Sequence, residues 1–87
     1  MEFAKHVKVR QEKFGAVVFE TLREKVFVTN ETGAEILSLL EEKEEPKEVT
    51  AELAKKYCVD SKLIESDVNG LISILEEKGI IKNKEQQ

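Results

Sequence analysis

The residues that could carry chemistry are few and scattered in this sequence. It holds one histidine, His6, and one cysteine, Cys58. A transition-metal site needs several imidazole, thiolate or carboxylate ligands at suitable spacing, and one chain with this inventory does not assemble them. The four glycines are dispersed and form no phosphate-binding loop. The sequence therefore predicts neither a metal site nor a cofactor.

Each reactive side chain also has an ordinary structural interpretation. His6 lies near the N-terminus, in a segment that we expect to be frayed and solvated. Cys58 follows Tyr57 at the predicted end of an amphipathic helix, where a small, partly buried residue is expected. The carboxylates come in runs such as residues 41–45, which are typical of a solvated loop rather than of an acid and base paired in a cleft. We therefore predict a protein that binds, and we assign no catalytic residue.

Size and composition fit one small domain over residues 1–87. The chain has 87 residues, of which 40% are hydrophobic and 37% charged, and this balance is typical of a globular chain with a single core. The single cysteine excludes an internal disulfide, which fits a reducing cytoplasm. No signal-peptide segment occurs, and no apolar run approaches the ~18 residues that would span a membrane. We expect a cytoplasmic protein without membrane contact.

The first third of the chain has the pattern of β-structure. Valine alternates with charged residues at positions 7–10, and β-branched and aromatic residues dominate positions 16–19 and 26–28. These runs predict three short strands, over residues 7–12, 16–21 and 25–29. Because the breaks between them are short, we expect an antiparallel meander joined by tight turns.

After Asn30 the hydrophobic period becomes that of a helix. Asn30 is a favourable N-cap, and Thr32 with Glu35 offers a capping box as the alternative. Pro46 suits the first turn of a second helix. These signals predict helices over residues 31–42 and 47–57.

A third helix follows, and it is the longest predicted element. Asp60 or Ser61 caps its start, and Gly79 is typical of the residue after a helix end. The helix is predicted over residues 61–78, followed by Ile80 and Ile81 as a short strand or apolar plug, and by a polar tail over residues 82–87. A three-stranded antiparallel β-meander followed by three α-helices is an α+β, winged helix-turn-helix-like domain.

Four segments of the chain, in this order, also resemble a known family. They are VTNETGAEIL (residues 28–37), VTAELAKKY (49–57), IESDV (64–68) and LISILEEKGII (71–81). With the strands before them they resemble, over residues 7–81, the PqqD-like family. This family includes the peptide chaperone of pyrroloquinoline quinone (PQQ) biosynthesis and the recognition elements of ribosomally synthesised and post-translationally modified peptides (RiPPs). One departure is the acidic stretch at residues 41–46, where family members often have a compact Asp-Gly turn.

The resemblance implies a function and a site. Such domains are non-catalytic modules, or peptide chaperones, that bind the leader segment of a precursor peptide and deliver it to a maturation enzyme. That enzyme is most often a radical S-adenosylmethionine (radical SAM) enzyme; a lasso-peptide leader protease or a cyclodehydratase also uses such a module. In the family the leader adds as an antiparallel strand to the edge of the third strand, in a groove against helix three. The implied peptide-binding residues are Arg23, Lys25, Val26, Phe27, Val28 and Thr29 on the strand and Leu63, Asp67, Leu71 and Ile74 on the helix.

Three features of this candidate site leave alternatives open. Phe27 points to the opposite face from Val26 and Val28, so either Phe27 or the valine pair can lean into the groove. Asp67 lies mid-helix among apolar residues and needs a partner, which is a cation of the edge strand or a donor on the peptide. Gly70 lowers helix propensity by roughly 1 kcal/mol relative to alanine, so either a neighbour approaches closely or an exposed glycine is tolerated.

The distribution of charge separates the competing functions. Residues 1–25 carry six bases and four acids, whereas residues 26–87 carry eight bases and fourteen acids. The predicted third helix is acidic, which is the wrong sign for a helix that reads DNA. Arg23 and Lys25 on the edge suit a peptide with acidic residues, or else guard the edge against aggregation. We expect no nucleic-acid partner; a winged-helix nucleic-acid-binding regulator and a small homodimeric interaction domain remain the alternatives, and the state is monomer or homodimer.

Overall fold

The computed structural model describes residues 2–42 and 45–82 and contains five strands and three helices in these ranges. The elements, in chain order, are β1 (Glu2–Phe3), β2 (Val7–Glu12), β3 (Gly15–Glu20), β4 (Lys25–Thr29), α1 (Glu31–Glu41), α2 (Pro46–Tyr57), α3 (Ser61–Glu77) and β5 (Ile81–Lys82). Each predicted strand and helix is present with ends within one residue of those expected. The α+β prediction is confirmed. The expected polar tail lies outside the described residues except for Lys82, which belongs to β5.

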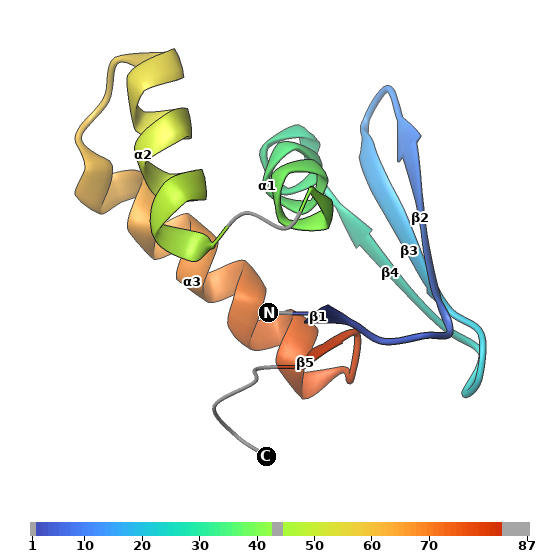
Figure 1. The fold of residues 1–87 in the computed structure, drawn as a ribbon. Helices are drawn as coiled ribbons and strands as arrows, with labels where there is room; N and C mark the ends of the chain where they lie inside the picture. The colour runs from blue at the N-terminus through green and yellow to red at the C-terminus, as the bar shows by residue number, and fades with distance from the viewer. Residues whose placement is uncertain (1, 43–44, 83–87) are drawn as a thin grey trace.

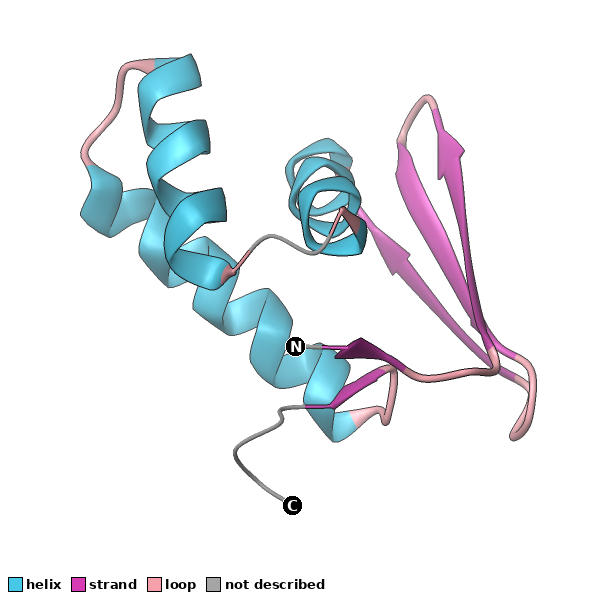
Figure 2. Cartoon of the chain, in the orientation of Figure 1, coloured by secondary structure: helices cyan, strands magenta, loops and turns pink. Residues whose placement is uncertain are grey.

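The sheet has the strand order β2-β3-β4, with both pairings antiparallel, so that β2 and β4 are its edges. Figures 1 and 2 show α1 between this sheet and the pair formed by α2 and α3. Ala16 and Val18 of β3 point toward the helices and are fully buried. The core lies between the layers and consists of Ala16, Val18, Ala34, Ile36, Leu37, Leu40, Val49, Leu53, Ile64, Val68, Ile72, Leu75, Ile80 and Ile81.

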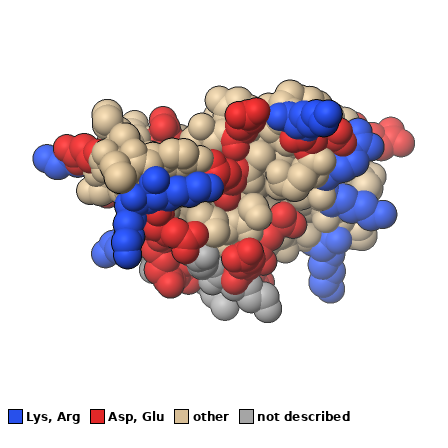
Figure 3. Space-filling view, turned by 90° about the horizontal axis from the view of Figure 1, so that it is seen from above, with Lys and Arg blue, Asp and Glu red and all other residues tan. Residues whose placement is uncertain are grey.

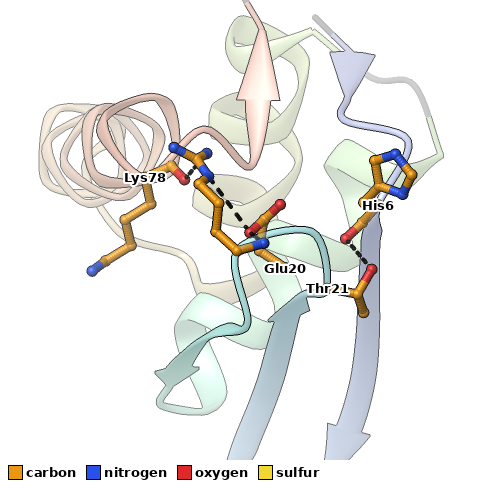
Figure 4. A network of polar contacts seen from close by, with 5 residues as sticks. His6, Glu20, Thr21 and Lys78 are labelled. Atoms are coloured by element: carbon orange, nitrogen blue, oxygen red, sulfur yellow. Dashed lines mark hydrogen bonds and ion pairs between the residues drawn. The ribbon is translucent and has the colours of Figure 1, made fainter.

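The two ends of the described chain meet in a second, small sheet. β1 pairs with β5, with Glu2 opposite Lys82 and Phe3 opposite Ile81. Of the short strand and the apolar plug that were the alternatives for Ile80 and Ile81, the structure has features of both, because Ile81 pairs in β5 and both side chains are buried. The expectation of a frayed N-terminal segment is wrong for the described residues. The backbone N–H and the hydroxyl of Thr21 both donate to the carbonyl oxygen of His6, at 2.8 and 3.2 Å (Figure 4). These contacts fix the N-terminal segment against the turn between β3 and β4.

The helix starts resolve the alternatives that the sequence left open. The side chain of Asn30 accepts a hydrogen bond from the Gly33 N–H at 2.9 Å, so Asn30 is the N-cap of α1. Asp60, rather than Ser61, caps α3 by accepting from the Lys62 N–H at 2.9 Å. No helix in the described ranges is long and apolar enough to cross a lipid bilayer.

Replacing the N-cap residue provides a test of this helix start. Asn30→Ala removes the acceptor for the Gly33 N–H, so we expect the free energy of unfolding to fall by about 1 kcal/mol. Urea denaturation followed by circular dichroism measures the change. Thr32→Ala is the matched control, and an equal loss in both variants would contradict the assignment of Asn30 as the cap.

The end of α2 differs from the expected apolar stripe. Tyr57 is 46% exposed and does not join the core; its hydroxyl donates to a carboxylate oxygen of Glu35 on α1. The same carboxylate binds Lys56 at 2.6 Å. Cys58 is exposed and has a left-handed backbone conformation, with φ of 54°. Val49, Leu53 and Tyr57 share one side of α2, but only Val49 and Leu53 are buried in the core. Tyr57 lies at the surface, where its hydroxyl is bonded to Glu35.

Candidate functional site

A groove of about 400 Å³ lies between the edge strand β4, the start of α1 and the helix α3. It is formed where the open edge of the sheet faces a helix across a gap that no other described element fills. The residues that line it are Phe27, Thr29, Asn30, Thr32, Gly33, Ile36, Ser66, Asp67, Gly70, Leu71 and Ile74.

Alternation along β4 determines which of its side chains reach the groove. Phe27 and Thr29 point toward the helices and line it, whereas Val26 and Val28 point to the outer face of the sheet and are 59% and 56% exposed. Of the two arrangements that the sequence allowed, the structure therefore has Phe27 at the groove. Thr29 is buried, and its hydroxyl accepts from the Ala16 N–H at 3.2 Å and donates to the Asn30 carbonyl at 3.0 Å. These bonds hold the end of the edge strand in place.

The opposite wall comes from one side of α3. Leu71 is half-buried and Ile74 is 40% exposed, and both line the groove. Gly70 lies beside them, and apart from its chain neighbours and the backbone of its own helix, no atom of the described chain comes within 4 Å of the position where a Cβ would lie. Nothing in the described chain therefore approaches Gly70; its missing side chain leaves room in the groove. Leu63 is 65% exposed and does not line the groove, unlike the other three helix residues of the predicted set.

Asp67 is the single ionisable residue among those that line the groove in the described chain. It is exposed, and within residues 2–42 and 45–82 its carboxylate has no hydrogen bond or ion pair. Of the two partners that the sequence suggested, a cation of β4 is therefore not engaged. A donor on a bound peptide remains a prediction.

Arg23 has an internal role that its sequence position did not reveal. Its guanidinium donates to the Lys78 carbonyl at 3.3 Å and lies 3.7 Å from the buried carboxylate of Glu20 (Figure 4). The same carboxylate accepts from the backbone N–H of Arg23 at 2.8 Å. Arg23 thereby joins the turn between β3 and β4 to the C-terminal end of α3, where the helix dipole favours a cation.

Two further cations lie where the start of β4 meets the C-terminal end of α3. Lys25 is exposed at the start of β4, and the Lys78 ammonium lies 5.6 Å from the centroid of the Phe27 ring. Seen from above in Figure 3, acidic and basic side chains are interspersed, with several lysine and arginine side chains at the sheet end of the molecule.

Within the described chain, no group of three or more His, Cys, Asp or Glu residues is placed to hold a metal ion.

The sequence did not predict that the N-cap and the first turn of α1 line the groove. Asn30, Thr32 and Gly33 line it, and Ile36 contributes from the core. Their proximity to β4 in the sequence is a usable signal, because a helix that starts directly after an edge strand presents its first turn beside that edge. On α3, Ser66 and Gly70 were also missed as lining residues, although Gly70 follows Asp67 by three residues and Ser66 by four and so shares a helical side with each.

Two solved structures have the same fold. The first, TbiB1 in complex with the TbiA(beta) leader peptide, superposes with a TM-score of 0.87, 24% identity and coverage of 95% of this chain and 96% of that one. The second, lasso peptide synthetase B1 complexed with the leader peptide, has a TM-score of 0.82, 25% identity and coverage of 93% and 95%. Among curated protein sequences, none matches the chain significantly.

The family model described as "Coenzyme PQQ synthesis protein D (PqqD)" matches residues 15–81 of this chain. The match covers β3, β4, the three helices and the start of β5, and so includes both walls of the groove. The resemblance expected from the sequence is confirmed, and the chain belongs to the PqqD family.

Proposed function

We propose that this chain is a non-catalytic peptide-binding module that binds the leader segment of a ribosomally made precursor peptide and delivers it to a maturation enzyme in RiPP or PQQ-type biosynthesis. The observation that carries the proposal is the groove between the unpaired edge of β4 and α3. Membership of the PqqD family and the fold shared with two leader-peptide complexes support it.

The geometry suits binding by strand addition. Among the described strands, β4 pairs with β3 alone, so its outward N–H and C=O groups are open to pairing with an added strand. Such backbone pairing gives affinity with little dependence on sequence, and pockets under alternate side chains add specificity. In an added strand every second side chain would face Phe27, Leu71 and Ile74, which supply apolar contact.

The other edge of the sheet is less suited to this role. On β2 the outward-facing side chains include Lys8 and Arg10, and Arg10 is paired with Glu12 at 2.5 Å. Charged side chains on an edge strand disfavour pairing with another chain. We therefore assign the peptide to β4 rather than to β2.

The chemistry of maturation is assigned to a partner. The groove-lining residues offer hydroxyl, amide and one carboxylate group and no imidazole or thiol, so we assign no catalytic residue and no cofactor to this chain. A radical SAM enzyme is one candidate for the maturation enzyme. A lasso-peptide leader protease is the other, and the fold shared with lasso peptide synthetase B1 favours it.

Titration of a fluorescent synthetic leader tests the proposal, with the leader taken from a precursor peptide encoded beside the gene of this chain. We expect saturable binding in the micromolar range or tighter, measured by fluorescence anisotropy. Absence of leader binding together with salt-sensitive binding to duplex DNA would instead favour a nucleic-acid-binding regulator.

A polar substitution in the helix wall should weaken this binding while keeping the fold. Ile74→Asn removes a partly exposed apolar side chain from the groove, and we expect leader affinity to fall about fivefold, or ~1 kcal/mol. Ser73→Asn, at the neighbouring exposed position outside the groove, is the matched control. Equal affinities of the two variants would place the peptide elsewhere.

A further inference from the structure

The position of Asp67 bears on which peptides the groove accepts. Asp67 is the one ionisable residue in the groove lining of the described chain, and no described residue pairs with it. Binding an apolar peptide there would remove water from this carboxylate without replacing the lost hydrogen bonds, which is unfavourable. A cationic side chain of the peptide would compensate, and it would distinguish one peptide from another.

The two walls of the groove run in opposite directions. The start of β4 lies at the C-terminal end of α3, because Arg23 in the preceding turn contacts the Lys78 carbonyl and the Lys78 ammonium lies over Phe27. Figure 4 shows this neighbourhood, with Lys78 at the end of α3 facing the turn that follows Glu20. Asp67 precedes Ile74 by two helical turns, or about 10 Å along the axis. Asp67 therefore stands toward the Thr29 end of β4.

The direction of an added strand follows from the sheet. Both strand pairs of the three-stranded sheet are antiparallel, and antiparallel pairing is also the more favourable and more frequent kind. A peptide antiparallel to β4 would run from the Thr29 end toward the Lys25 end. It would meet Asp67 first, then the apolar part of the groove, and then the two cations Lys25 and Lys78.

The spacing of the two contacts can be matched by neighbouring inward-facing residues of the peptide. Side chains two residues apart on a strand lie on one face, about 7 Å apart. One turn of α3, about 6 Å, separates Asp67 from Leu71, which lines the groove with Phe27 and Ile74. A cation facing Asp67 therefore places the side chain two residues later against these apolar residues.

Resting on the function proposed above, we propose that Asp67 is a specificity-determining residue and that the groove selects leader peptides in which a lysine or arginine precedes a bulky apolar residue by two positions. The order is cation first in the N-to-C direction. Acidic residues immediately after the apolar one are also favoured, because that end of the groove carries Lys25 and Lys78.

Selection from a random twelve-residue peptide library, displayed on messenger RNA, tests the proposal and does not require that the precursor be identified. Immobilised protein should enrich peptides with Lys or Arg two positions before Phe, Tyr, Leu or Ile. If no peptide is enriched and none binds saturably, the proposed function itself fails. If peptides are enriched without this cation, the function stands and the role of Asp67 is refuted.

A charge exchange with one selected peptide separates a direct contact from a structural effect. We expect Asp67→Asn to weaken its binding about three- to fivefold, the range of a partly exposed ion pair, and Asp67→Lys to weaken it further. A peptide with glutamate in place of this cation should bind Asp67→Lys more tightly than the original peptide does, and it should bind the wild type more weakly than the original peptide does. Glu65→Gln, on α3 outside the groove, is the control and should bind like the wild type; failure of the exchange to restore binding would overturn the proposal.

Discussion

Gly70→Leu should lower the affinity for a leader peptide tenfold or more, or by at least ~1.4 kcal/mol, without weakening the fold. Apart from its chain neighbours and the backbone of its own helix, no atom of the described chain lies within 4 Å of the Cβ position of residue 70, which lines the groove beside Leu71 and Ile74. A leucine side chain on a helix leans toward the preceding turn, here toward Ser66 and Asp67, and so would occupy space that the peptide needs. Leucine is also a better helix former than glycine by several tenths of a kcal/mol, so the variant should be more stable.

Opposite changes in stability and binding make this substitution informative. Thermal unfolding and fluorescence anisotropy measure the two quantities on the same sample. Gly70→Ala is the matched control, since it should add about 1 kcal/mol of helix stability while leaving most of the groove open. A Gly70→Leu protein that is folded and binds the leader as tightly as Gly70→Ala would show that the groove is not the binding site.

Gly15→Ala should cost about 3 kcal/mol or more of the free energy of unfolding. Gly15 has a φ of 151°, which residues with a side chain rarely adopt. An added Cβ would also collide with the carbonyl oxygen of Thr29 and come within 2.7 Å of the carbonyl of Asn30. The atoms that the added Cβ would meet belong to the backbone at the junction between β4 and α1. The collision can therefore be avoided only if the edge strand or the start of the helix moves.

The effect of Gly15→Ala is measured by urea denaturation. Because small domains have only about 5–15 kcal/mol of stability, a loss of this size should be evident as a large shift in the midpoint. Gly70→Ala again serves as the comparison, since the same chemical change has open space there. A loss below about 0.5 kcal/mol in Gly15→Ala would contradict the close packing of β3 on the β4–α1 junction.

The elements with a clear hydrophobic period could be predicted from the sequence. The alternation in residues 7–12 and the helical stripe of α3 extend over enough positions to define a period, and the strong caps Asn30 and Asp60 locate the helix starts. The short strand β1 could not be predicted, because two residues define no period and its partner β5 is remote in the sequence. Tertiary contact alone orders that segment.

The residues of the groove were predicted only in part, because contacts between segments that are remote in the sequence leave no local pattern. Phe27, Thr29, Asp67, Leu71 and Ile74 were reached through the family resemblance and lie together in the structure. Arg23 was expected as a contact for the peptide, yet its guanidinium is engaged by Lys78 and Glu20. Residues 23 and 78 are distant in the sequence, and the pattern of either segment alone contains no sign of this contact.

Hydrogen exchange of the β4 amides gives the most direct test of strand addition in the groove. Exchange of the backbone amides is measured by NMR with and without a saturating peptide, either the leader or one selected from the random library. Outward-facing N–H groups of Lys25–Thr29 should become protected, because they gain hydrogen bonds to the peptide, while those of the β2 edge, Val7–Glu12, should be unchanged. Saturable binding with unchanged exchange throughout β4, or with new protection at β2 instead, would contradict the account.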